Sequence, residues 1–238
     1  MANGKWKMEN GTARINARAL LLPFAIYHLP FAILLLLSGC TALGVAAYKL
    51  HGPPKVPAEY VPEPRPMLVL VENYQHQSSV NAHADLLGRM LVKELEARRV
   101  APIVPLDRLQ ELRDARPRDF QTMSMASIGR EVGAEQILYV QLHNSDVTPM
   151  SGGDALTGQT AASVKVVDVA TGDTLWPGGV AGEAGYPVSA ATKLGTSNGG
   201  NVQDVRQRMY RQLSFQIARL FYKWQPEEEE PEGFTQGG

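Results

Sequence analysis

The sequence has very little cysteine, no excess of basic charge and no pattern of metal ligands. A single cysteine occurs among 238 residues, so no disulfide can form within the chain. Lys and Arg number 23 against 24 Asp and Glu, and this balance excludes the strongly basic domain that nucleic-acid binding generally needs. No Cys/His ligand spacing is present, which argues against a structural zinc site. The length allows one ordinary domain with appendages and excludes a large multidomain enzyme.

Catalytic motifs are also scarce. We find no HExxH zinc motif, no phosphate loop ending in GK[ST], and no SxxK motif with its companion KTG. His76 and His83 are seven residues apart, and His51 and His143 lie far from both, so no pair of these has the i, i+4 spacing of helical metal ligands. We interpret them as solvated or hydrogen-bonded side chains. The sequence therefore predicts no enzyme activity, no metal site and no cofactor.

A basic segment followed by a long uncharged one opens the chain. The first eighteen residues carry four bases against one acid, a net charge of +3, and residues 19–37 contain no charged side chain. This order is typical of a secretory signal peptide. The uncharged run is also long enough to cross a membrane as a helix, so an uncleaved anchor is the alternative. Pro23, His28 and Pro30 would weaken a permanent spanning helix but cost little in a segment that is removed.

The four residues from Leu37 to Cys40 (LSGC) resemble the lipobox of bacterial lipoproteins. In that motif small residues admit the signal peptidase, and the cysteine thiol takes a diacylglycerol. The resemblance implies a signal peptide over residues 1–39, cleavage between Gly39 and Cys40, and lipid, palmitate included, on Cys40 as the link to a membrane. It also explains the lone cysteine, because a lipidated sulfur is inert in an oxidising compartment. Thr41 after the cysteine implies sorting to the outer membrane, with the domain on the periplasmic face.

Segments rich in proline or glutamate flank the predicted domain. Residues 40–66 are rich in proline and lack apolar periodicity, so we expect an extended tether of about 80 Å at ~3.1 Å per residue. The run from Glu227 to Glu230 and the glycine-containing end predict a disordered acidic tail over residues 226–238. The folded domain is therefore expected over residues 67–225.

Strand and helix patterns follow one another through this domain. We expect strands at 67–71, 100–104 and 136–142, and helices beginning at Asn81, over Leu106 to Ala115, and from Ser124 to Gly133. Residues 162–169 and 174–176 predict a hairpin, residues 177–200 an irregular strand with a mobile loop, and residues 201–224 the longest helix. The predicted fold class is α/β: a central mixed β-sheet flanked by helices, with a C-terminal hairpin and a long final helix.

Two segments resemble linked motifs of one group of bacterial envelope proteins: Ile128 to Val140 (IGREVGAEQILYV) and Val164 to Trp176 (VKVVDVATGDTLW). In that group a helix ends in a Gly-Ala turn into a strand, and a later strand carries Asp before a Thr-Gly hairpin. The group contains the CsgG-like curli-assembly lipoproteins, the LpoB-like activators of penicillin-binding proteins and the TolB N-terminal domain. The resemblance implies an α/β fold and an envelope partner such as a peptidoglycan synthase or a secretion component.

The last helix is the sharpest candidate for partner binding. Its apolar stripe should cover the sheet and leave five bases on other faces, namely Arg206, Arg208, Arg211, Arg219 and Lys223. One interpretation is a solvated face whose late bases suit the helix C-terminus. The other is an electrostatic contact with an acidic partner or anionic head groups, in competition with the glutamate tail.

Other candidate side chains have structural interpretations. We expect Asp168 and Asp173 to accept backbone hydrogen bonds in the hairpin turn, and Trp176 to pack against a helix. The sequence as a whole predicts a lipid-anchored accessory or scaffold protein that binds another envelope protein or assembly. The alternative is a subunit of a homo-oligomeric, curli-type export complex.

Overall fold

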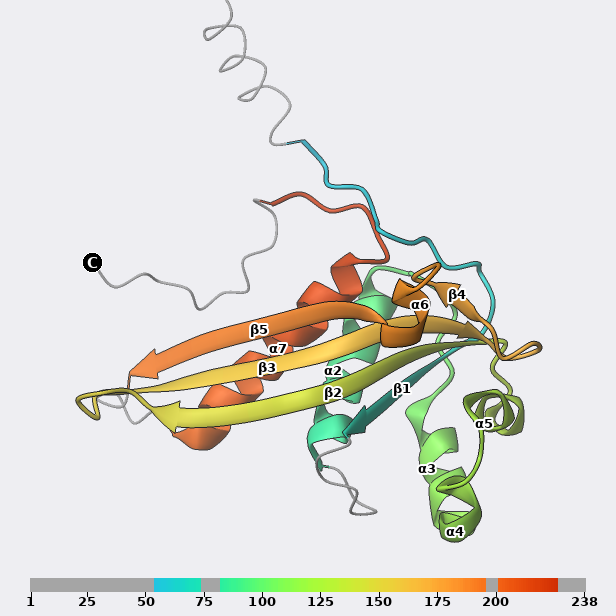
Figure 1. Cartoon of the computed structure of the whole chain (residues 1–238), viewed down its shortest axis with the longest axis horizontal. Coiled ribbons are helices and arrows are strands. Elements are labelled where there is room, and N and C mark those ends of the chain that lie inside the picture. The colour runs from blue at the N-terminus through green and yellow to red at the C-terminus, as the bar shows by residue number, and fades with distance from the viewer. Residues whose placement is uncertain (1–53, 74–81, 196–200, 227–238) are drawn as a thin grey trace, which may run out of the picture. The chain divides into compact units, whose positions relative to one another are not determined.

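The computed structural model describes residues 54–73, 82–195 and 201–226 (Figure 1). The chain divides into two compact units, Met1–Pro54 and Lys55–Gly238, and every feature below belongs to the second unit. The predicted signal peptide, Gly39 and Cys40 lie outside the described residues, as do the predicted helix cap Asn81 and the glutamate run. Within the described part of the chain, no helix combines the length and apolarity needed to cross a membrane.

A five-stranded mixed sheet forms the centre of the domain (Figure 1). Its strands are β1 (Met67–Asn73), β2 (Gln136–Pro149), β3 (Ala155–Asp168), β4 (Thr174–Trp176) and β5 (Tyr186–Gly195). The order is β1-β2-β3-β4, and β5 also pairs with β3. β1 and β2 are parallel, whereas the pairings of β3 with β2, β4 and β5 are antiparallel. The predicted α/β class with a central mixed sheet is confirmed.

The helices lie on both faces of this sheet. They are α2 (Ala82–Ala97), α3 (Leu106–Ala115), α4 (Pro117–Phe120), α5 (Met125–Val132), α6 (Ala181–Ala184) and α7 (Val202–Arg219). α2 and α7 share one hydrophobic cluster with one face of the sheet. α3 and α5 share a second cluster with the opposite face, near β1 and the start of β2 (Figure 1). The long final helix is thus confirmed as a cover of the sheet, although it ends at Arg219 and not at residue 224.

β1 is buried on both of its faces, as its continuous apolar run predicts. Val69 and Val71 belong to the cluster of α2 and α7, while Leu68 and Leu70 belong to that of α3 and α5. Side chains alternate between the faces of a strand, so a strand between two helical layers must be apolar at every position. β1 therefore packs against the helices on both faces of the sheet.

Local signals place the ends of α5 where the sequence predicts them. The Ser124 side chain accepts a hydrogen bond from the Ser127 N–H at 3.2 Å, and Gly133 ends the helix in the left-handed region with φ of 78°. Gly129, in the motif IGREVGA, is required by packing, because a Cβ there would lie 2.5 Å from a Val169 methyl carbon. That glycine lets α5 approach the sheet closely.

Three sequence predictions for strands need correction. Residues 100–104 form no strand; only Ile103 makes an isolated bridge, to Met67, and Pro102 supplies no N–H for a ladder. The strands expected over residues 136–142 and 162–169 are longer than predicted, because residues 144–149 of β2 pair with residues 156–161 of β3. The irregular strand expected within residues 177–200 is the regular strand β5, paired with β3 along its whole length. The predicted mobile loop, residues 196–200, lies outside the described residues.

Small residues explain how the long end of the sheet is covered. Gly158 of β3 lies under α7, where a Cβ would meet a methyl carbon of Val205 at 2.8 Å. Thr160 and Ala190 are buried beside it on the same face. Their small side chains let α7 lie close to the strands. Because large apolar residues are few at this end of the strands, no hydrophobic run in the sequence marks it.

Candidate functional site

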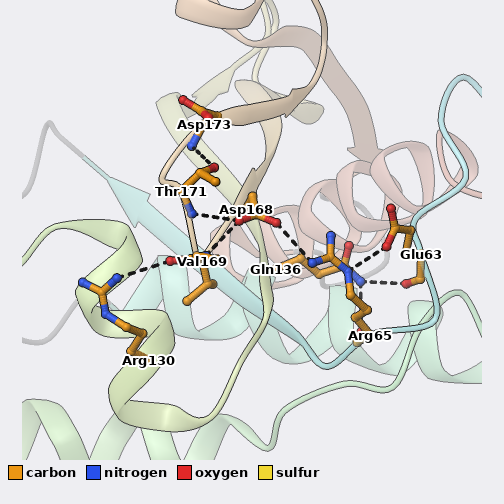
Figure 2. Close-up of polar contacts among 9 residues, drawn as sticks. Glu63, Arg65, Arg130, Gln136, Asp168, Val169, Thr171 and Asp173 are labelled. Atoms are coloured by element: carbon orange, nitrogen blue, oxygen red, sulfur yellow. Dashed lines mark hydrogen bonds and ion pairs between the residues drawn. The ribbon is translucent and has the colours of Figure 1, made fainter.

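Asp168 connects the end of β3 to the segment that precedes β1 (Figure 2). One carboxylate oxygen, Oδ1, accepts hydrogen bonds from the backbone N–H groups of Ala170 at 2.8 Å and Thr171 at 2.9 Å. The other, Oδ2, accepts a hydrogen bond from Nη1 of Arg65 at 3.1 Å. The turn bonds agree with the predicted structural role of Asp168. No local sequence pattern predicts the contact between Asp168 and Arg65.

The charges of this pair stabilise each other. The Thr171 N–H, then the Arg65 guanidinium, hold the pKa of the Asp168 carboxyl below its ordinary value. The hydrogen bond to Asp168 in turn raises the pKa of Arg65. The Asp168 side chain is 13% exposed and that of Arg65 is 27% exposed, so solvent reaches only a part of the ion pair. Arg65 Nε also lies 3.0 Å from a Glu63 carboxylate oxygen.

Asp173 plays a backbone role across the same turn. Its N–H donates to Thr171 Oγ1 at 3.1 Å (Figure 2). Its carbonyl accepts the Asp168 N–H at 2.9 Å. The hydrogen bonds thus use main-chain groups of Asp173, whereas the sequence predicts that its carboxylate accepts backbone hydrogen bonds. Asp168 thus holds the turn through its carboxylate and Asp173 through its main chain, which is the arrangement expected of two structural residues.

The buried side chain of Gln136 holds the chain around Arg65 in place through hydrogen bonds. It is fully buried, and its Nε2 donates to the carbonyl oxygens of Glu63 at 2.8 Å and Arg65 at 2.9 Å (Figure 2). The Pro66 carbonyl accepts the N–H groups of Glu135 and Gln136. A buried amide that donates twice to one segment fixes both its position and its direction. We call residues 55–66 the strap.

Aromatic rings hold the middle of the strap. Tyr60 stacks on Trp176 with ring centroids 6.0 Å apart, and Trp176 stacks on Tyr186 at 5.0 Å and meets the edge of Phe221 at 5.7 Å. The Tyr60 N–H also donates to the Leu220 carbonyl at 3.0 Å. Burial, followed by the charge of Glu63, raises the pKa of Tyr60. Trp176 therefore packs where the end of α7 meets the sheet, as the sequence predicts, and the strap covers it.

The beginning of the strap pairs with the end of the chain's last helical region. Val56 and Trp224 exchange two backbone hydrogen bonds, of 2.7 Å and 3.1 Å. The Arg219 guanidinium lies over the rings of Trp224, at 3.9 Å, and Phe215, at 4.1 Å. The expected tether is therefore wrong in its second half: residues 55–66 are packed structure, and the domain begins before Met67. Proline gave these residues the composition of a linker, but backbone bonds and aromatic contacts fix them to the domain.

The five bases predicted for partner binding do not form one group. Arg208, Arg211 and Lys223 are exposed, whereas Arg219 stacks between two aromatic rings. Arg206 is half-buried: its Nη1 donates to Gln203 Oε1 at 3.2 Å, and its Nε is buried. Arg206 is therefore less accessible to an external partner than Arg208 and Arg211, the exposed bases near the middle of the helix.

The described histidines have neighbours of a structural kind. His143 Nε2 and Ser163 Oγ lie 2.7 Å apart on adjacent strands, and the His83 ring lies against Tyr210 with centroids 5.9 Å apart. Across residues 54–73, 82–195 and 201–226, no group of three or more His, Cys, Asp or Glu side chains is arranged to hold a metal ion. His51 and His76 are outside the described residues.

One hydrolase-like spacing occurs in the sequence after β5. Gly195 to Gly199 reads GTSNG, which matches the pattern GxSxG that places a nucleophilic serine between a strand and a helix. Here the segment follows β5, which within the described part of the chain pairs only with β3, and residues 196–200 are outside that part. A nucleophile also needs a histidine within hydrogen-bond reach, and His143 is bonded to Ser163 on other strands. The spacing alone gives no basis for a catalytic assignment.

Comparisons with known proteins give structural matches at low identity. No protein-family model matches the sequence, and no curated protein matches it. The solved structure of lipoprotein GNA1162 from Neisseria meningitidis has 16% identity over 65% of this chain and 99% of its own, with a TM-score of 0.42. The LpoB C-terminal domain from Salmonella enterica has 19% identity over 57% and 87%, with a TM-score of 0.32. The PelC dodecamer from Paraburkholderia phytofirmans has 13% identity over 71% and 93%, with a TM-score of 0.33.

The first of these structures is described as a lipoprotein. All three TM-scores lie below 0.5 and all three identities below 25%.

Proposed function

We propose that this chain is a lipid-anchored accessory protein of the bacterial envelope, held at the periplasmic face of the outer membrane, that binds another envelope protein or assembly. The observation that carries the proposal is the order of features at its N-terminus. A basic segment and an uncharged run lead to LSGC at the only cysteine, and the chain is packed onto a folded domain from Val56 onward. Lipid on Cys40 would therefore tie one defined point of that domain to a membrane.

The packed strap shortens the reach of the domain. Only residues 41–54 separate the lipid site from the start of the strap. Fully extended, they span at most about 45 Å at ~3.3 Å per residue. A free tether over residues 40–66 would have allowed about 80 Å. We therefore place the partner of this domain close to the membrane surface.

Arg208 and Arg211 are the side chains that we assign to partner contact. They lie one helical turn apart, are exposed, and follow a capping box at Asn201 that fixes the start of α7. Exposed charges of one sign steer association with a partner of the opposite sign and make it dependent on salt. The partner surface is accordingly acidic.

Crosslinking in intact envelopes tests this proposal. The wild-type chain is compared with an Arg208→Glu/Arg211→Glu variant and with a matched Arg118→Glu/Lys193→Glu variant, which reverses two exposed bases elsewhere. We expect the first variant alone to capture less partner and to lose most of the salt dependence. Equal capture by all three proteins across a salt series contradicts the assignment. A ring-sized particle in detergent would favour the alternative of a homo-oligomeric export complex.

A further inference from the structure

Charge is unevenly distributed over the folded domain. We use the name helical layer for α2 with the turn after it (residues 82–99) and α7 with its flanking residues (201–223). This layer carries nine Lys and Arg against four Asp and Glu, a net charge of +5. Residues 100–195 carry seven bases against eleven acids, a net charge of −4. An anionic segment is therefore attracted to one face of the domain and repelled by the rest of it.

Bases of both helices face away from the sheet. On α2, Arg89 and Lys93 are exposed, while Leu87 and Leu91 are buried in the core. On α7, the exposed Arg208 and Arg211 lie on the side of the helix opposite the buried residues Met209 and Leu213. α2 and α7 pack against each other on the same face of the sheet, so these bases form one outward surface.

The two helices also come together at their C-terminal ends. The Arg98 guanidinium lies 5.0 Å from the centre of the Tyr222 ring, which joins the end of α2 to the segment after α7. Arg99 and Lys223 are exposed beside this contact. The chain leaves the described structure at Pro226, three residues after Lys223, and therefore leaves from the basic end of the helical layer.

Arg99 occupies a backbone position that usually belongs to glycine. Its φ is 53°, and the N–H groups of Arg99 and Val100 bond back to the carbonyls of Glu96 and Leu95, both at 3.0 Å. This is the Schellman ending of a helix, where glycine adopts the left-handed conformation without strain. Arg99 is thus an exposed base at a position where the backbone favours glycine, and it follows a second base, Arg98.

The segment that follows is acidic and of matching charge. Residues 226–238 contain Glu227 to Glu230 and Glu232 and no base, a net charge of −5. We infer that this tail lies along the helical layer of its own chain and covers the surface that an acidic partner would use. Residues 227–232 span about 20 Å at ~3.3 Å per residue, and the axis of α7 from Arg219 back to Arg208 is about 17 Å long. Direct attachment gives the tail an effective concentration on the order of millimolar at this surface.

Helix dipoles do not account for the whole basic surface. Bases near the C-terminal ends of α2 and α7 are favoured by the carbonyl dipoles there. Arg208 lies in the first half of α7 and Arg89 in the middle of α2, where the dipole gives a base no advantage. Their positions are explained by an anionic segment that lies along the layer.

Proteolysis of the full-length protein tests this inference, which does not depend on the lipid anchor or on an envelope partner. The protein is purified in neutral detergent and treated with a glutamate-specific protease, and release of the tail peptides is followed by mass spectrometry. Wild type is compared with Arg208→Glu/Arg211→Glu and with the matched Arg118→Glu/Lys193→Glu variant. All four positions are exposed in the fold, and thermal unfolding confirms that each protein is folded.

We expect tail release from the first variant to be at least about fivefold faster than from wild type at ~0.05 M salt, because the covering surface has been reversed. The matched variant should be cleaved at the wild-type rate. Salt of about 0.5 M should bring wild type to the fast rate, since exposed charges are then screened within a few ångströms. Equal rates for the three proteins at low salt overturn the inference. Protection that rises with protein concentration also overturns it, because the tail would then cover a second copy.

Discussion

Arg65 Nη1 lies 3.1 Å from Asp168 Oδ2, although 103 residues separate the two in sequence. Arg65 belongs to the strap, and Asp168 ends β3 and organises the turn into β4. The contact joins the segment that enters the domain to the hairpin in which Asp168 precedes a Thr-Gly turn. It therefore couples the position of the N-terminal attachment to the fold of the sheet.

Replacing Asp168 should destabilise the domain more than replacing Arg65. Asp168→Ala removes the acceptor of two backbone N–H groups as well as the Arg65 contact, and we expect a loss of about 2 kcal/mol in the free energy of unfolding. Arg65→Met removes only a partly exposed charge pair, which should cost about 1 kcal/mol or less. Urea denaturation of both variants measures the difference. Equal losses would show that the ion pair, and not the turn, is the main contribution of Asp168.

The stability given by the Asp168 carboxylate should depend on pH. Because the turn N–H groups and Arg65 lower its pKa in the folded state, its contribution is fully present above the unfolded-state pKa of about 3.9 and is lost as pH falls through the lower folded-state value. The gap in unfolding free energy between wild type and Asp168→Asn should stay constant from about pH 7 to pH 5 and shrink below about pH 4. A gap independent of pH in that acidic range contradicts the assigned charge interaction.

The strap should behave as part of the folded domain. Deleting residues 55–62 removes the Val56–Trp224 pairing and exposes the face of Trp176 that Tyr60 covers. We expect a lower melting temperature and a change in tryptophan fluorescence. Tyr60→Ala alone should cost about 1 to 2 kcal/mol through lost aromatic burial. A deletion that leaves the melting temperature unchanged would instead support a free tether over this segment.

Arg99→Gly should stabilise the domain. The left-handed conformation at this position is strained for arginine and unstrained for glycine, so relief of that strain outweighs the greater chain entropy of glycine in the unfolded state. We expect a gain of about 0.5 to 1 kcal/mol in the free energy of unfolding, measured with urea. Arg99→Ala, which keeps a Cβ, should give no such gain. Equal effects of the two substitutions would remove backbone strain as the cause.

Much of the fold follows from local patterns. The buried strand β1, the helix between Ser124 and Gly133, and the long final helix have signals within a few residues of one another, and the structure confirms them. The regular pairing of β5 and the long end of β3 were not predicted, because small residues such as Gly158 take the place of a hydrophobic run where α7 approaches. The strap was missed because its partners Asp168, Trp176 and Trp224 are far away in sequence.

The candidate site shows the same limits. The turn role of Asp168 and the packing of Trp176 could be predicted because Thr-Gly turns and strand aromatics have known local chemistry. The separation of Arg206 from Arg208 was overlooked when the five bases were grouped, although residues two apart in an α-helix lie about 200° apart around its axis and therefore face different sides.

The central claim, a domain tied to a membrane through Cys40, is tested most directly by mass spectrometry of the N-terminal peptide from the membrane fraction of producing cells. We predict that the mature chain begins at Cys40 and that its sulfur carries a diacylglycerol. Cys40→Ala should then accumulate as an unprocessed, slower-migrating precursor. An intact peptide that runs through Leu37 to Thr41 with an unmodified thiol, or a mature chain found only in the soluble fraction, would contradict the account.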